Sequence, residues 1–147
     1  MKGNSEVMRK VLMTLMNISG RKTTEGHAIF VMDSLIEKLG SQFDFLKNVT
    51  VSDTRFLEED LSITVMSDVD SIPSVDVGKA IHDIIVNTNE MLGRDAGHFF
   101  IKELSRNIGD EYHSAIKEMG VDLSLMQLEF EVNEMEKRIF QTRKTSD

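Results

Sequence analysis

Glycine residues at the ends of apolar stretches divide this chain into short segments. Gly40, Gly93, Gly109 and Gly120 each follow directly after residues that repeat at helical spacing. Glycine commonly terminates helices because it adopts left-handed backbone conformations without steric cost. The sequence therefore predicts a helix end at each of these four positions.

Apolar residues spaced three and four apart predict five helices between these breaks. The first ends at Gly20, the second begins at the Thr23-Thr24 cap, and the third follows Pro73, which a first helical turn tolerates. The fourth and fifth are each expected to begin at an Asp cap. The expected ranges are 5–18, 23–39, 73–92, 96–108 and 110–119.

The hydrophobic period changes to two in the middle of the chain. Phe43, Phe45, Val49 and Val51 alternate with polar residues, and the same alternation recurs over 61–66. This pattern predicts two strands, 43–51 and 61–66, in a small antiparallel sheet. The polar segment 52–60 between them is longer than a tight turn, so the sequence leaves open whether the strands are neighbours.

The last segment is compatible with a helix or a strand. Its apolar residues repeat at intervals of 3, 4, 3 and 4, which favours a helix with one apolar face. Residues 127–133 also alternate, and a third strand there would complete a sheet that is marginal with two strands. We expect the helix. Its apolar face consists of Leu125, Leu128, Val132, Met135 and Ile139.

These patterns together predict one α+β domain, mostly helical, in which five or six helices pack on a small antiparallel sheet. A chain of 147 residues with 40% hydrophobic and 29% charged residues is long and apolar enough to build one core. Residues 1–4 and 142–147 are polar and lack periodicity, so both ends are expected to fray.

Composition excludes several classes of protein. The absence of cysteine excludes disulfides, thiolate metal sites and a cysteine nucleophile. No apolar run approaches the roughly 20 residues of a membrane span, and the N-terminal residues do not make a signal peptide, so we expect a cytoplasmic protein without membrane contact. The net charge of −8 repels phosphate backbones, so no nucleic-acid partner is expected.

A short internal repeat provides the one candidate metal site. Asp95 to Leu104 and Asp110 to Met119 share five identities in ten positions, and each begins Asp-x-x-His. A carboxylate and an imidazole three residues apart on a helix can bind Zn, Fe or Mn, as paired motifs do in four-helix bundles. The candidate ligands are Asp95, His98, Asp110 and His113. Consecutive helices that begin with a cap and a surface Lys-Glu pair explain the same residues without a metal.

The sequence contains no familiar catalytic motif and none specific enough to identify a family, so the cofactor, if there is one, is unknown. We expect a non-enzymatic regulatory, sensory or adaptor domain that acts through protein association, with itself as a dimer or with another protein. Three features predict the dimer: the small sheet, the 3-4 apolar face of the last segment, and a methionine-rich first helix.

Two alternatives remain open. The first is a small metal-binding protein or metal-dependent enzyme that uses the paired Asp-x-x-His motifs. The second and weaker one treats the first two helices as a helix-turn-helix DNA reader, although the start of the second helix offers little beyond Thr23, Thr24 and one repelling carboxylate at Glu25.

Overall fold

The computed structural model describes residues 3–53, 62–97 and 100–145. These residues form six α-helices, two 3₁₀ helices and one two-stranded antiparallel sheet, which confirms the mostly helical α+β fold. In chain order the elements are α1 (Asn4–Lys22), α2 (Glu25–Leu39), η1 (Asp44–Asn48), β1 (Val49–Val51), β2 (Ile63–Val65), η2 (Ser67–Ser71), α3 (Ser74–Gly97), α4 (Phe100–Ile108), α5 (Asp110–Glu118) and α6 (Leu123–Thr145).

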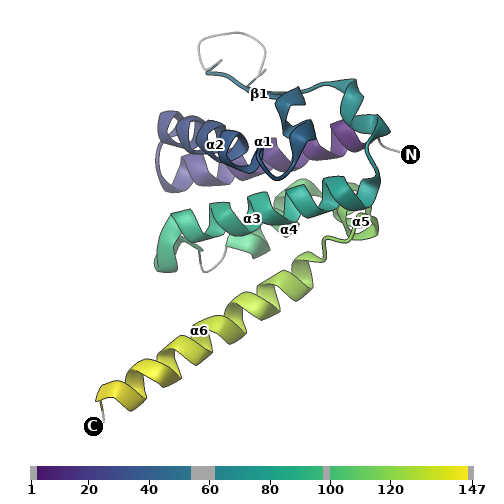
Figure 1. The fold of residues 1–147 in the computed structure, drawn as a ribbon. Helices are drawn as coiled ribbons and strands as arrows, with labels where there is room; N and C mark the ends of the chain where they lie inside the picture. Colours follow the sequence, from purple (N-terminus) through teal and green to yellow (C-terminus); the bar gives the residue numbers. More distant parts are fainter. Residues whose placement is uncertain (1–2, 54–61, 98–99, 146–147) are drawn as a thin grey trace.

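The helices form a bundle from which one helix projects. α1 and α2 lie side by side, α3 runs alongside them, and α4 and α5 lie behind α3 in the view of Figure 1. The sheet packs on α1 and α2. α6 leaves the bundle diagonally and ends far from it (Figure 1).

Two of the predicted helix ends are wrong. α1 continues through Gly20 to Lys22, and α3 continues through Gly93 to Gly97. A helical glycine costs only about 1 kcal/mol relative to alanine, so a glycine ends a helix only where the chain must also turn. Gly109 and Gly120 meet that condition, with φ of 83° and 97°.

The Asp caps predicted for the fourth and fifth helices are also wrong. Asp95 was expected to cap the fourth helix, but its backbone lies in the last turn of α3, and α4 begins only at Phe100. Gly109, not Asp110, is the N-cap of α5. The prediction for α2 is confirmed, because the Thr24 side chain accepts a hydrogen bond from the backbone N–H of His27 at 3.1 Å.

The sheet is smaller than the alternation predicts. Val49 pairs with Val65, and Val51 pairs with Ile63. The preceding residues, expected to belong to the first strand, form the 3₁₀ helix η1, which buries Phe45. The alternation of Phe43 and Phe45 with polar residues therefore resembles a strand pattern, although Phe45 lies in a 3₁₀ helix. The possible third strand at 127–133 is helical and belongs to α6.

Long-range polar contacts attach the sheet region to α1. The Arg9 side chain donates from Nε to the Ile63 carbonyl at 3.0 Å. Asp70 of η2 accepts the backbone N–H of Ser5 at 2.8 Å and so caps the first turn of α1. The side chain of Asn4 donates to the Ile72 carbonyl at 2.9 Å. Nothing in the local sequence identifies these partners.

α1 lies at the centre of the core, and its apolar side chains are almost completely covered. Met8 and Met16 belong to this set and contact the other buried residues of the cluster. The methionines of the first helix therefore serve as core residues, and they no longer argue for association. The buried apolar residues of α1 are Val7, Met8, Val11, Leu12, Leu15, Met16 and Ile18.

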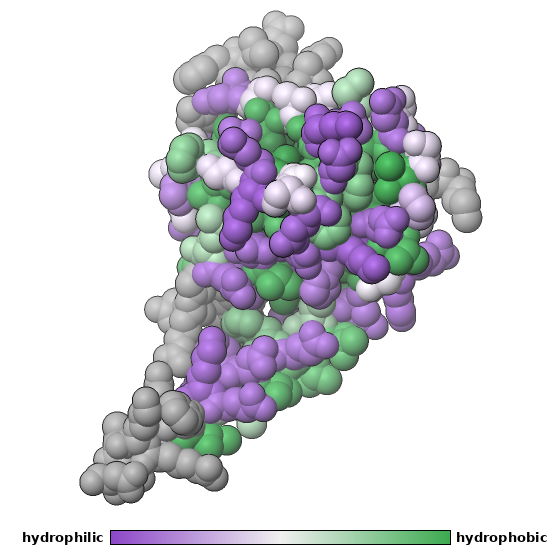
Figure 2. Space-filling view, in the orientation of Figure 1, coloured by the Kyte–Doolittle hydropathy of each residue, from purple (hydrophilic) through white to green (hydrophobic). Residues whose placement is uncertain are grey.

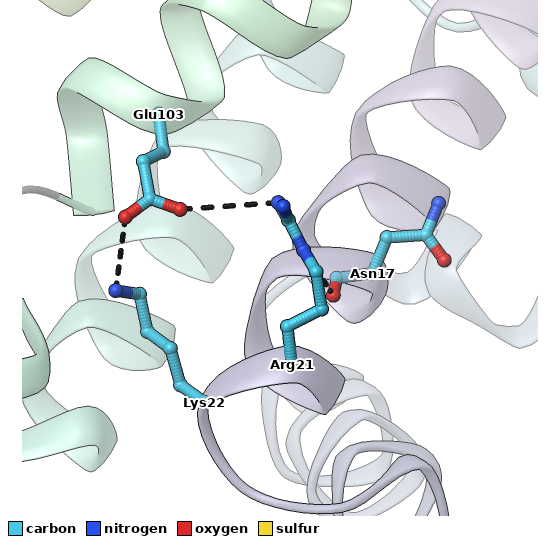
Figure 3. A network of polar contacts seen from close by, with 4 residues as sticks. All are labelled: Asn17, Arg21, Lys22 and Glu103. Carbon is cyan, nitrogen blue, oxygen red and sulfur yellow. Dashed lines mark hydrogen bonds and ion pairs between the residues drawn. The ribbon is translucent and has the colours of Figure 1, made fainter.

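An ion-pair cluster joins the end of α1 to α4. Figure 3 shows Glu103 of α4 directed toward Lys22 and Arg21. The Lys22 Nζ lies 2.9 Å from one Glu103 carboxylate oxygen, and an Arg21 guanidinium nitrogen lies 3.8 Å from the other. Both cations of the last turn of α1 thus face an acidic residue of the same chain.

Replacing this carboxylate is expected to have a small effect. Glu103→Gln should lower the free energy of unfolding by about 1 kcal/mol or less, because partly exposed ion pairs are weak. The loss should shrink further at high salt. Urea unfolding of both proteins at low and high salt measures it. A loss that does not depend on salt would contradict an electrostatic origin.

Candidate functional site

The candidate site is the outer face of α6, and the start of this helix determines where that face points. Gly120, with its positive φ, turns the chain out of α5. Asp122 then accepts the backbone N–H of Leu125 at 3.1 Å and caps the new helix. Leu123 and Met126 are buried and hold the first turn against the bundle.

The opposite face of α6 is apolar and exposed. Leu125 is 51%, Leu128 56%, Val132 44%, Met135 60% and Ile139 53% exposed. These are the five residues that the sequence predicts as an interface, and the helix aligns them at 3-4 spacing along one face; we call them the α6 seam. Figure 2 shows hydrophobic residues gathered along the edge of the projecting helix that faces away from the bundle.

The bundle-facing side of α6 is held mainly by its first half. Phe130 packs against the core, and Glu131 lies 3.7 Å from the Lys102 Nζ of α4. Gln127 donates from Nε2 to the same Glu131 carboxylate at 2.9 Å. Farther along, Glu134 pairs within the helix with Lys137 at 3.7 Å. The first half of α6 is therefore anchored, and the second half projects (Figure 1).

A groove of about 660 Å³ separates α3 from the inner side of α6. Its lining combines apolar with polar and charged side chains, and Asn89 among them is almost completely buried. Within the described part of the chain, the Oδ1 atom of Asn89 has no hydrogen-bond partner. No sequence pattern indicates this groove, because it depends on the angle at which α6 leaves the bundle. Its lining is His82, Val86, Asn89, Glu90, Ile101, Met126, Glu129, Phe130, Asn133, Glu134 and Lys137.

The predicted metal ligands are only partly described. Asp110 and His113 lie in the first turn of α5, where the His113 backbone N–H donates to the Gly109 carbonyl at 3.0 Å. His98 and the side chain of Asp95 lie outside the part of the chain that is described. Among the side chains that are described, no three His, Asp or Glu residues are grouped as metal ligands would be. The metal site thus remains a prediction from sequence.

The helix-turn-helix alternative likewise remains untested. Thr24 caps α2, and the neighbouring cations Arg21 and Lys22 contact Glu103.

None of the helices formed by the described residues combines the length and apolar character that crossing a bilayer would require.

Comparisons with protein-family models, curated proteins and solved structures give no match to this chain. The function is therefore inferred from the chain's own residues, above all from the α6 seam.

Proposed function

We propose that this protein is a non-enzymatic regulatory or adaptor domain that acts through protein association, and that it forms a homodimer through the α6 seam. The observation that carries the proposal is the seam itself: five large apolar side chains, each about half exposed, at coiled-coil spacing on a projecting helix. Scattered apolar side chains are ordinary on a protein surface, but a continuous stripe of them is typical of an interaction site.

The size of the seam suggests a weak dimer. Burying the exposed half of each side chain contributes about 1 kcal/mol, since complete burial of such a residue contributes about 1.5–3 kcal/mol. Four or five such side chains from each copy supply a gain of about 8–10 kcal/mol. This gain is of the same order as the 4–15 kcal/mol, roughly, that association costs. We therefore expect monomer and dimer to exchange with protein concentration, as suits a regulatory domain.

The small sheet and the methionines of the first helix, which also predict a dimer in the sequence, lose weight in the structure. α1 and α2 cover the two-stranded sheet, so it needs no second copy to be stable. Met8 and Met16 of α1 are buried in the core, and Met13 is partly buried against it. The proposal therefore rests on the seam alone.

Val132→Glu tests the seam. In the single chain Val132 is exposed, so the variant is expected to keep the wild-type unfolding midpoint. In the dimer the change places an unpaired carboxylate in an apolar contact, which should shift the mass from dimer to monomer. Sedimentation velocity at high micromolar concentration measures the mass, and thermal unfolding measures the midpoint.

Asn133→Glu is the matched control. It adds the same charge to the next residue, which lines the groove on the other side of the helix, so the dimer should persist. A strictly monomeric wild-type protein would refute the proposal. A Val132→Glu protein that unfolds would show that the seam packs within one chain.

A further inference from the structure

We infer that the two α6 helices of the dimer run antiparallel, in a register that places Val132 against Met135 of the second copy. This inference rests on the proposed function and specifies its partner, a second copy of α6, together with its orientation. The observation that carries it is the charge of the residues that border the seam.

The spacing of the seam assigns each bordering residue a position in the heptad a to g. Leu125, Val132 and Ile139 occupy position a, and Leu128 and Met135 occupy position d. On one side, position e is occupied by Glu129 and Glu136. On the other side, position g is occupied by Glu131 and Arg138. In a two-stranded coil these e and g residues meet across the interface and determine the orientation.

A parallel pair brings like charges together. In that arrangement a g residue meets the e residue of the next heptad in the other helix. Glu131 would then face Glu136 of the second copy, and two-fold symmetry would repeat the contact on the other side. No opposite charge among the described border residues compensates for these two repulsive contacts.

An antiparallel pair improves the charge pattern. In this arrangement the residues at position a pack on the residues at position d of the second copy. Val132 therefore meets Met135 of the second copy, and Leu128 meets Ile139 of the second copy. Position g then meets g, and Glu131 faces Arg138 of the second copy twice, with opposite charges. Position e meets e, so Glu129 faces Glu136 of the second copy. One attractive contact therefore offsets each repulsive one, whereas the parallel pair has only repulsion.

The position of Glu131 fits this role. Its carboxylate contacts Gln127 and Lys102 of its own chain, which fixes the side chain at the border of the seam, and the side chain is still 40% exposed. A cation from a second helix can therefore add to the existing contacts. Antiparallel pairing also places the two bundles at opposite ends of the helix pair, because each bundle holds only the first half of its α6 (Figure 1).

Disulfide trapping tests the orientation, because the protein has no native cysteine to interfere. Leu128→Cys and Ile139→Cys are prepared as separate full-length proteins, mixed under reducing conditions and then oxidised. In the antiparallel pair, Leu128 of one copy lies opposite Ile139 of the other, so the mixture should give a disulfide between the two different chains. A mass tag on one chain identifies that product.

Each protein alone should remain uncrosslinked. In the antiparallel pair of Leu128→Cys proteins, the two introduced thiols are separated by eleven residues of helix, about 16 Å, far beyond the 4.4–6.8 Å, roughly, that a disulfide spans between Cα atoms. A parallel pair would instead align each cysteine with its own copy, so disulfides within each separate sample would overturn the inference. Leu125→Cys mixed with Val132→Cys is the control, since these two positions are ten residues out of register in the antiparallel pair and seven in the parallel pair, roughly 15 Å and 10 Å along the helix.

Charge reversal gives an independent readout. Glu131→Lys should weaken an antiparallel dimer roughly tenfold at low salt, because it faces Arg138 of the second copy with a like charge. In a parallel dimer the same change faces Glu136 of the second copy and should tighten it, which would overturn the inference. Glu131→Gln removes the contact with Lys102 without reversing the charge and serves as the control. Adding Arg138→Glu to Glu131→Lys should restore the affinity.

The two proposals fail in different ways. If the wild-type protein sediments as a monomer, the dimer itself is refuted. If the wild-type protein is a dimer but crosslinks only between identical cysteines, the dimer stands and the antiparallel orientation is wrong.

Discussion

Gly78→Ala is expected to lower the free energy of unfolding by about 3 kcal/mol or more, and the melting temperature by roughly 10 °C. Gly78 is a buried residue of α3, and the chain that leaves α5 passes directly over it. A β-carbon there would collide with the Met119 carbonyl oxygen and lie 2.9 Å from the carbonyl carbon. Backbone atoms cannot move aside as the end of a side chain can, so α5 or α3 must shift.

Gly20→Ala is the matched control, because it makes the same change in another helix. A β-carbon at Gly20 would meet the Glu25 backbone at 3.5 Å, an ordinary van der Waals contact. Alanine is the better helix former, so this variant should gain about 0.4–1 kcal/mol. Urea unfolding should therefore move in opposite directions for the two variants. An unchanged midpoint for Gly78→Ala would mean that the backbone at Met119 does not pass over α3 in this way.

Phe100→Ala is expected to cost about 3–5 kcal/mol, a large share of the 5–15 kcal/mol, roughly, that stabilises a domain of this size. Phe100 is completely buried at the start of α4, where it is one of the largest side chains without exposed surface. α4 lies between α1 and α6, so the cavity would loosen contacts that position both helices. Thermal unfolding measures the loss.

Phe30→Ala makes the same truncation on the surface. Phe30 lies on α2 and is 69% exposed, so its loss should change the stability by about 0.5 kcal/mol or less. Comparable losses for Phe30→Ala and Phe100→Ala would contradict the burial described for both residues.

Local patterns predicted much of the fold, and they failed where tertiary contacts decide. Helical periodicity found α2 and α5 with nearly correct ends, and it favoured a helix for the last segment. It could not tell that Gly93 would remain helical while Gly109 turns, because the difference lies in backbone angles that packing imposes. For the same reason the alternation of Phe43 and Phe45 did not reveal the 3₁₀ helix η1.

The candidate site was predicted in part. The 3-4 spacing of Leu125 to Ile139 identified the apolar face of α6 without any structural information. The spacing could not show whether that face would lie in the core or at the surface. This depends on the direction of the chain after the turn at Gly120, which the local sequence does not determine. The capping of α1 by Asp70 was equally unpredictable, because 65 residues separate the two partners.

The central position of α1 has a consequence for how the protein folds as it is synthesised. α1 contacts α2, α3, α4, α5 and β2, so several partners of this helix are synthesised much later than the helix itself. Contacts between residues far apart in sequence slow folding, because the chain must close large loops before it gains their energy. Part of the apolar side of α1 therefore stays uncovered on the ribosome until α4 and α5 emerge. During that interval the nascent chain is most vulnerable to aggregation and most in need of a chaperone.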